Sequence, residues 1–496
     1  MKKYFLLILF AVFAISCSKK DLVFTGKINN PAPLSRIELI DVSSVATLPI
    51  ANIGIDEKGN FSDTISVKKD GIYALVYQGK VNFLYLKNGE NLNLEGNGST
   101  FPEDLKISGK GQGNNEFLIE SQKFITSYFS KLNQAVLAKN ENDFIKEIEK
   151  YSADINKKLD EIAKSKNADK DVIEWKKSDL MVNLLMISSQ YEMMHGQMTQ
   201  NPDFKVSEKF KESQKKFEKE SLIKEFPAYR QYLLGKLEPD FRKFATPFLN
   251  DTKTTQTEVF LKFLETRKEF SQEQKDYLAA YIATQFDLHP QNDKIEQVLK
   301  ALTEKVKSEN IKKDLERVYT AIVGPKVGSA LPEEVNFIKQ DGKAYKISEL
   351  KGKPTLLIFY SSFAPNIVQS AAALKEITEF YKAKLNVAYV NMDDDVKQFQ
   401  KTSKSLLNGF TGVNLYAKGG LKSEAAQQLH IYGFKLPSFM ILDKDGKVAS
   451  KTVLGLSNIQ LTELIDILNK QTGLTAPVPE ASETEEEHNE HDGHGH

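Results

Sequence analysis

The spacing of apolar and polar residues changes twice along the 496-residue chain and predicts three structural regions. The first, from Val23 to about residue 108, contains short β-branched and aromatic runs separated by turn sequences such as DEKGN and KNGEN. The strand-like runs are VFTGKI, RIELIDV, FSDTISV, GIYALVY and VNFLYLK. Many short strands at regular spacing favour an antiparallel sandwich or barrel. We therefore predict a β-sandwich-like domain over residues 23–115, with Gly109–Asn115 (GKGQGNN) as a flexible exit from the sheet.

A helical region is predicted over residues 116–325. Apolar residues recur there at intervals of three and four, against faces rich in Lys and Glu, as amphipathic helices require. No clear repeat period relates one helical segment to the next.

The third region, residues 326–473, alternates strands and helices. The continuous apolar run at residues 355–360 (TLLIFY) is typical of a buried parallel strand. We predict a helix over 366–383, a strand over 385–392, a helix over 396–407, strands over 438–442 and 447–454, and a closing helix over 458–470. This order predicts a mixed sheet covered by helices, so the whole chain is expected to be a multidomain α+β protein.

The landmarks of this third region resemble those of the thioredoxin fold, and most closely the membrane-tethered thiol–disulfide oxidoreductases of the TlpA/ResA type. Gly328 and Pro332 match the ends of a G-x-x-A-P entry, although Leu331 replaces its Ala. The segments at 350–354 (LKGKP), 432–438 (YGFKLPS, for Y-G-V-x-x-P-T) and 443–446 (DKDG) match later landmarks. The predicted β region is likewise similar to a domain of unknown function that precedes thioredoxin-like domains in bacterial lipoproteins.

The two cysteines of that family's W-A-[S/T]-W-C-x-x-C motif have no counterpart in this chain. Ala364 and Ile367 occupy their positions, within a degenerate active-site segment made of Phe363, Ala364, Pro365, Asn366 and Ile367. A helix N-terminus would lower the pKa of a cysteine thiol there, but neither residue has a group that can ionise or attack a disulfide. Cys17 is the only cysteine in the chain. We expect no catalytic residues and no thiol chemistry, although family-based naming would suggest a thiol–disulfide oxidoreductase.

The resemblance also implies that Leu436–Pro437 is a cis peptide beside the former active site, where the preceding backbone pairs with an extended substrate. Two interpretations remain open. Phe363, Ala364, Leu436 and Pro437, together with Pro365, could form a retained protein-binding groove. Alternatively, Pro437 only preserves the fold.

The N-terminus has the pattern of a secretory signal. Lys2 and Lys3 precede an apolar run that is too short to span a bilayer, and Ala14-Ile15-Ser16-Cys17 resembles the lipobox of bacterial lipoproteins. The resemblance implies a signal peptide over 1–16, lipid on Cys17 and a tether over 17–22. We expect a lipid-anchored protein of the cell envelope, most simply at the outer membrane, on its periplasmic or surface face. The alternative is an ordinary signal with an incidental cysteine.

Charge and the C-terminal tail narrow the possible partners. The formal net charge is zero, which argues against a nucleic-acid partner, since phosphate recognition needs a concentrated cationic face. Residues 474–496 read as a disordered acidic tail. Imidazoles and carboxylates there suit weak binding of Zn²⁺, Ni²⁺ or Cu²⁺, although a solvated tail without a metal role is the simpler interpretation. The histidines concerned are His488, His491, His494 and His496.

One acidic run needs a separate interpretation. Asp393-Asp394-Asp395 could bind a cation, but it follows a predicted strand and opens a predicted helix, where acidic side chains favour the helix dipole. We interpret it as a helix cap. The sequence as a whole suggests a redox-inactive thioredoxin-like domain, without a cofactor, that binds or assembles envelope proteins as an accessory subunit.

Overall fold

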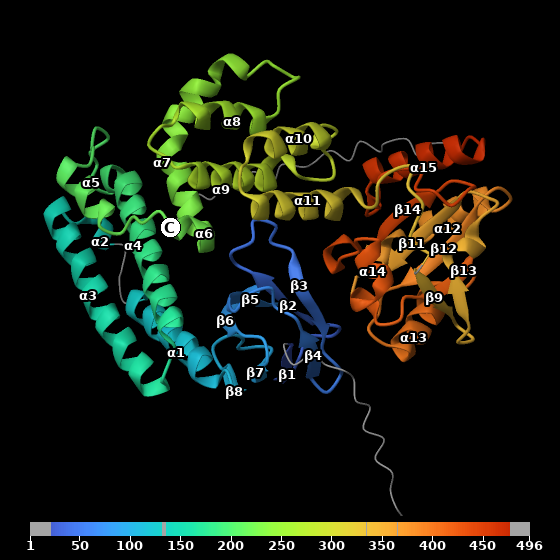
Figure 1. Ribbon diagram of the computed structural model, residues 1–496, viewed down its shortest axis with the longest axis horizontal. Helices are drawn as coiled ribbons and strands as arrows, with labels where there is room; N and C mark the ends of the chain where they lie inside the picture. Colours follow the sequence, from blue (N-terminus) through green and yellow to red (C-terminus); the bar gives the residue numbers. More distant parts are fainter. Residues whose placement is uncertain (1–20, 131–134, 334, 365, 477–496) are drawn as a thin grey trace, which may run out of the picture. The chain divides into compact units, whose positions relative to one another are not determined.

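The computed structural model of the chain describes residues 21–130, 135–333, 335–364 and 366–476. It divides into two compact units, residues 1–318 and 319–496 (Figure 1). The first unit contains the β region and almost all of the helical region, and the second contains the mixed α/β region. The predicted fold class, a multidomain α+β protein, is confirmed. Cys17, its tether as far as residue 20, and the four tail histidines lie outside the described residues.

The β region of the first unit is built from two four-stranded sheets with the orders β4-β1-β7-β8 and β3-β2-β5-β6. Their apolar side chains form one common core, to which Phe24 and Leu94 contribute from the first sheet, and Leu39 and Leu84 from the second. The strands are β1 (Leu22–Asn29), β2 (Arg36–Asp41), β3 (Pro49–Gly54), β4 (Asn60–Ile65), β5 (Gly71–Tyr77), β6 (Lys80–Leu86), β7 (Asn91–Asn97) and β8 (Lys106–Gly109). The sandwich prediction is therefore right in architecture.

The prediction of a wholly antiparallel β domain is wrong at one strand pair, because β1 pairs with β7 in parallel. Five strands lie between them in the chain, which is ample length for the crossover that parallel pairing needs. The sequence reasoning also missed β3, β7 and β8. Strand β7 reads NLNLEGN, and its Asn and Gly residues are disfavoured in strands, yet Leu92 and Leu94 alternate into the core.

The segment GKGQGNN is a fixed junction, which corrects its interpretation as a flexible exit. Helix α1 (Gln112–Phe129) begins inside the motif. Asn115 is fully buried, and its side chain pairs with edge strand β6, accepting from the Tyr85 amide (2.8 Å) and donating to the Tyr85 carbonyl (2.9 Å). The Asn114 side chain exchanges two hydrogen bonds with Asp169, the residue that precedes α4 (Lys170–Met198). The motif thus joins the sheet to two helices.

The helical region packs against the outer face of the second sheet. Phe83 of β6 contacts Trp175 of α4, with ring centroids 5.4 Å apart, and Trp175 stacks on Phe226.

Among the described residues, no helix is both long enough and apolar enough to cross a bilayer. The remaining helices are α2 (Ala135–Ala138), α3 (Glu141–Lys166), α5 (Glu208–Lys215), α6 (Leu222–Glu225), α7 (Pro227–Ala245), η1 (Thr246–Phe248), α8 (Gln256–Thr266), α9 (Gln272–Ile282), η2 (Ala283–Asp287), α10 (Ile295–Lys305) and α11 (Glu309–Val323).

The second unit is a seven-stranded mixed sheet in the order β10-β9-β13-β12-β11-β14-β15. Its strands are β9 (Asn336–Lys339), β10 (Ala344–Lys346), β11 (Thr355–Tyr360), β12 (Asn386–Asn391), β13 (Val413–Tyr416), β14 (Ser438–Leu442) and β15 (Val453–Leu454). Its helices are η3 (Ile347–Leu350), α12 (Asn366–Tyr381), α13 (Val396–Leu406), η4 (Gly420–Lys422), α14 (Glu424–Gln428), η5 (Gly433–Lys435) and α15 (Asn458–Thr472). The predicted strand over 447–454 is wrong for most of its length. The Val448 amide instead donates to the carbonyl of Ser329, and only Val453 and Leu454 form a strand.

Candidate functional site

The central strand β11 fixes the position of the candidate site. All six of its residues are buried, and its side chains alternate between two cores. Leu357 and Phe359 enter one core, while Ile358 and Tyr360 enter the other. Strand β14 runs antiparallel beside it and pairs Phe359 with Ser438. The loop that leaves β11, residues 361–364, and the segment that enters β14, residues 430–437, therefore meet at one end of the sheet.

The loop after β11 is held by a buried carboxylate. Asp393 is 1% exposed, and its Oδ1 accepts hydrogen bonds from the Ser362 amide and from Ser362 Oγ, both at 2.8 Å. Its Oδ2 accepts from Asn391 Nδ2 (2.9 Å) and Thr402 Oγ1 (2.8 Å). These four donors satisfy a charge that would be costly to bury alone. Asp393 thereby fixes the backbone that leads to the degenerate active-site segment.

The interpretation of the acidic run as a helix cap is right for Asp395. Its Oδ1 accepts hydrogen bonds from the Lys397 and Gln398 amides at 2.8 and 3.0 Å, at the start of α13. The role of Asp393 was missed, because the sequence does not show that Ser362 and Thr402 come to the same point.

The position of the first missing cysteine lies in the protein core. Ala364 is 7% exposed and belongs to the same core cluster as Leu436, and the partly buried Phe363 packs against that cluster. Asn366 and Ile367 open α12, and Pro365 lies outside the described residues. A methyl group at 364 offers neither a proton nor a nucleophile. Three of the four predicted groove residues therefore belong to one core cluster or pack against it, and the groove itself stays a prediction.

The segment that enters β14 carries the exposed part of the site. Leu436–Pro437 is a cis peptide, as the resemblance implied, and Pro437 follows Leu436 directly into the strand. Phe434 is 60% exposed and stacks on Tyr432 with ring centroids 5.6 Å apart. The sequence reasoning missed Phe434, although an aromatic residue where the family motif has Val was a usable signal. The Leu436 amide already donates to the Gly433 carbonyl (3.3 Å), so side chains rather than this amide offer contacts to a partner.

Two basic side chains lie in the same segment: Lys435, which is buried, and His430, which is half-buried. Lys435 is 2% exposed, and burial lowers the pKa of its amine from 10.5 to about 7. Its Nζ donates to the His430 carbonyl at 3.3 Å. Burial, and then the charge of Lys435, lower the pKa of the His430 imidazole below its usual 6.5. An ammonium group in such a place is unfavourable without a carboxylate partner.

The sheet order and the site landmarks agree with one family comparison, in which residues 352–448 match a family model described as thioredoxin-like. The second unit contains a thioredoxin-like domain. Its central strand, the degenerate loop and the cis-proline segment all lie within the matched residues. The comparison with curated proteins found no match.

Solved structures similar to the thioredoxin-like domain include three bacterial proteins. A carboxy-terminal domain assigned to a thiol–disulfide oxidoreductase of Bacteroides thetaiotaomicron is 27% identical, with a TM-score of 0.25, covering 29% of this chain and 97% of that one. The thioredoxin domain of a Bacteroides vulgatus thiol–disulfide oxidoreductase is 17% identical (TM-score 0.25; 29% and 96% covered). A thiol–disulfide oxidoreductase of Bacteroides fragilis is 22% identical (TM-score 0.25; 28% and 99% covered).

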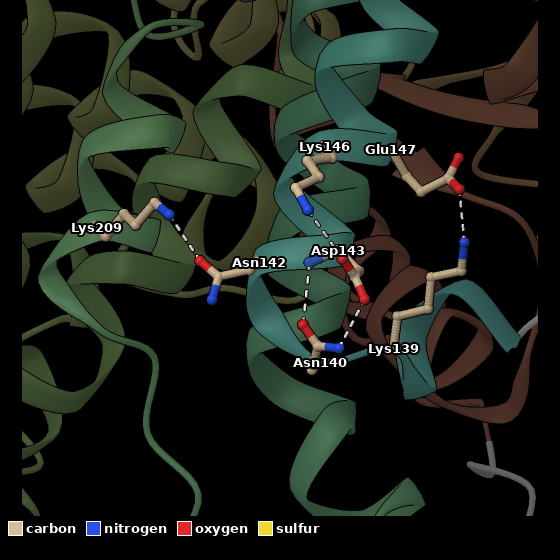
Figure 2. Close-up of polar contacts among 7 residues, drawn as sticks. All are labelled: Lys139, Asn140, Asn142, Asp143, Lys146, Glu147 and Lys209. Atoms are coloured by element: carbon tan, nitrogen blue, oxygen red, sulfur yellow. Dashed lines mark hydrogen bonds and ion pairs between the residues drawn. The ribbon is translucent and has the colours of Figure 1, made fainter.

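A hollow of about 270 Å³ lies at the start of α3 in the first unit and is lined partly by lysines. Figure 2 shows that two of these lysines have partners: Lys139 pairs with Glu147 at 2.6 Å, and Lys146 with Asp143 at 3.3 Å. Asn140 caps the helix by accepting from the Asp143 amide. The charges therefore stabilise the helix start and leave little net attraction for an anion.

Over the described ranges, no group of three or more His, Cys, Asp or Glu residues could hold a metal ion.

Proposed function

We propose that the protein is a lipid-anchored envelope protein whose thioredoxin-like domain binds a segment of a partner protein and carries out no thiol chemistry. Three properties of the chain support this proposal: its single cysteine, the residue at position 364, and the exposed aromatic surface beside Pro437. Attachment through Cys17 and a location at the outer membrane are parts of the same proposal, supported by the lipobox-like N-terminus.

The absence of a cysteine pair supports the non-catalytic part. Thiol–disulfide exchange needs a thiolate that attacks and a second sulfur that resolves the mixed disulfide. The chain has one cysteine, so it cannot form an intramolecular disulfide, and Ala364 lies where the attacking sulfur would be. A thioredoxin-like domain without a cysteine pair can bind another protein through its surface, but it cannot transfer electrons by disulfide exchange.

Phe434 is the observation that carries the binding part. A phenyl ring that is 60% exposed leaves apolar area that a partner can cover. Aromatic side chains contribute most to the energy of interfaces because they bury large areas with few rotatable bonds. The occupant that fits is an apolar segment of another envelope protein, held by side-chain contacts.

Site-specific photo-crosslinking tests this proposal. A benzophenone amino acid placed at 434 in the full chain, in native membranes, is expected to give one specific adduct, identified by mass spectrometry. The matched control is the same probe at Ile459, which is 73% exposed in the same domain. Adducts at 434 but not at 459 are the expected result. Equal labelling at both positions, or none at 434, would reject the binding surface.

A further inference from the structure

A hollow of about 420 Å³ lies at the C-terminal end of α4 in the first unit (Figure 1). Its volume is in the range of small-molecule sites in proteins. Glu192, Met193 and Gln197 of the helix line one side, and Pro202 and Phe204 of the following loop line the other. The hollow belongs to a different unit from the thioredoxin-like domain, so what it binds does not depend on the function proposed above.

The loop after α4 is folded back onto the helix. The Asn201 amide donates to the Gly196 carbonyl at 2.7 Å, and the Phe204 ring packs on the buried His195 ring, with ring centroids 4.3 Å apart. Glycine is required at 196, because a Cβ atom there would lie 2.6 Å from the Asn201 carbonyl oxygen. Gln200 completes the turn with a φ of +56°, which non-glycine residues seldom adopt. The turn is fixed by these contacts, so the hollow exists before a ligand binds.

The charge at the hollow is negative. Of the residues that line it, only Glu192 is charged, and its side chain has no ion-pair or hydrogen-bond partner among the described residues. Lys211 of α5 pairs with Glu208 at 2.7 Å, and the Glu208 carboxylate, followed more weakly by Glu192, raises the pKa of the Lys211 amine. The negative end of the α4 dipole lies at the same place. A cation is therefore the charge that this hollow favours.

The rest of the lining suits an apolar stem that carries such a cation. Met193 is 70% exposed, and its flexible, polarisable thioether can follow the shape of an alkyl chain. Pro202 and Phe204 add ring surfaces, along which an alkyl stem can lie while its charged head stays in contact with water and Glu192. The side-chain carbonyls of Gln197 and Gln200 can accept hydrogen bonds from an ammonium group.

We propose that the hollow at the end of α4 is a binding site for an organic cation, an ammonium or guanidinium group on an alkyl stem. The Lys or Arg side chains of a partner protein have this chemistry, and so does a small free amine.

Methyl NMR of the full chain, labelled with ¹³C at its methionine methyl groups, tests the site. The chain has eight methionines, and Met193→Leu identifies the resonance of Met193. n-Butylamine, which reproduces the lysine side chain, should shift this resonance in a saturable way at pH 7. 1-Butanol and butanoate should bind about fivefold more weakly or worse, because they cannot pair with Glu192. Met181, about 18 Å earlier along the same helix at about 1.5 Å per residue, should keep its resonance.

Two matched variants test the role of the carboxylate. Glu192→Gln should lower the affinity for n-butylamine by about fivefold, the effect of an exposed ion pair, and should leave the affinity for 1-butanol unchanged. Glu174→Gln, at an exposed glutamate of the same helix, should bind n-butylamine as the wild type does.

A short peptide with one central lysine distinguishes the two sources of the cation. Tighter binding than n-butylamine assigns the cation to a partner protein, and weaker binding assigns it to a small free amine. The proposal is overturned if n-butylamine does not shift the Met193 resonance, if 1-butanol binds as tightly as n-butylamine, or if Glu192→Gln loses no more affinity than Glu174→Gln.

Discussion

Asp393→Asn is expected to destabilise the second unit by about 3–5 kcal/mol. The carboxylate accepts four hydrogen bonds at a position that is 1% exposed, and hydrogen bonds to a charged group contribute about 1.5–3 kcal/mol each. An amide replaces one acceptor oxygen with a donor NH₂ group, which would face donors from Asn391 and Thr402 or from Ser362. The hydroxyl on that side can turn to accept from the new group, but the N–H of Asn391 or of Ser362 would lose its acceptor.

The measurement is hydrogen exchange of the β11 peptide as a function of urea, which gives the free energy of unfolding of that sheet. Trp175, the only tryptophan, lies in the first unit and provides an internal control, since its fluorescence transition should not move. The matched variant is Asp394→Asn, at the exposed neighbouring residue, for which a change within about 0.5 kcal/mol is expected. Similar effects at 393 and 394 would contradict the assigned role of Asp393.

Lys435→Met is expected to stabilise the second unit, by about 2–4 kcal/mol at pH 7. Methionine has a similar length and carries no charge, so it can fill the same apolar site. A fall in the pKa of the amine from 10.5 in the unfolded chain to about 7 corresponds to about 5 kcal/mol, at 1.36 kcal/mol per tenfold change. Relaxation of the surrounding segment makes the measured gain smaller than this limit.

The same substitution should change how stability depends on pH. Between pH 7 and pH 10.5 the unfolded wild-type chain binds a proton at Lys435 that the folded chain does not, so stability rises with pH across this window. Below pH 7 both states are protonated and the penalty is constant. Urea unfolding at pH 7 and pH 9 should show this rise in the wild type and not in Lys435→Met. A destabilised Lys435→Met variant would show that the amine makes a favourable interaction in the fold.

The sequence predicted those elements whose pattern follows from burial alone. TLLIFY is apolar at every position because β11 is buried on both faces, and the structure places the strand at the predicted residues. The polar strand β7 and the isolated bridges at residues 447 and 448 depend on pairing partners distant in the chain, and local pattern does not record these. Propensity was overridden there by tertiary contacts.

Some features of the candidate site could likewise be predicted from the sequence, and others could not. The missing cysteines and the cis-proline landmark could be recognised as motifs, and the structure brings Phe363, Ala364 and Leu436 into one cluster. The positions of Lys435 and Asp393 inside the protein could not be recognised, because Lys and Asp are usually exposed and nothing local indicates otherwise. The replacement of the family's Val by Phe434 marks this position, but its exposure depends on tertiary contacts that local sequence does not record.

The central claim is that this thioredoxin-like domain works without thiol chemistry, and an insulin-reduction assay tests it most directly. The purified full chain with Cys17→Ser, supplied with dithiothreitol as the electron donor, should reduce insulin no faster than the buffer blank, while an active thioredoxin serves as positive control. The wild-type chain should give the same result, because Cys17 has no partner thiol. Turnover above the blank by the Cys17→Ser chain would contradict the account.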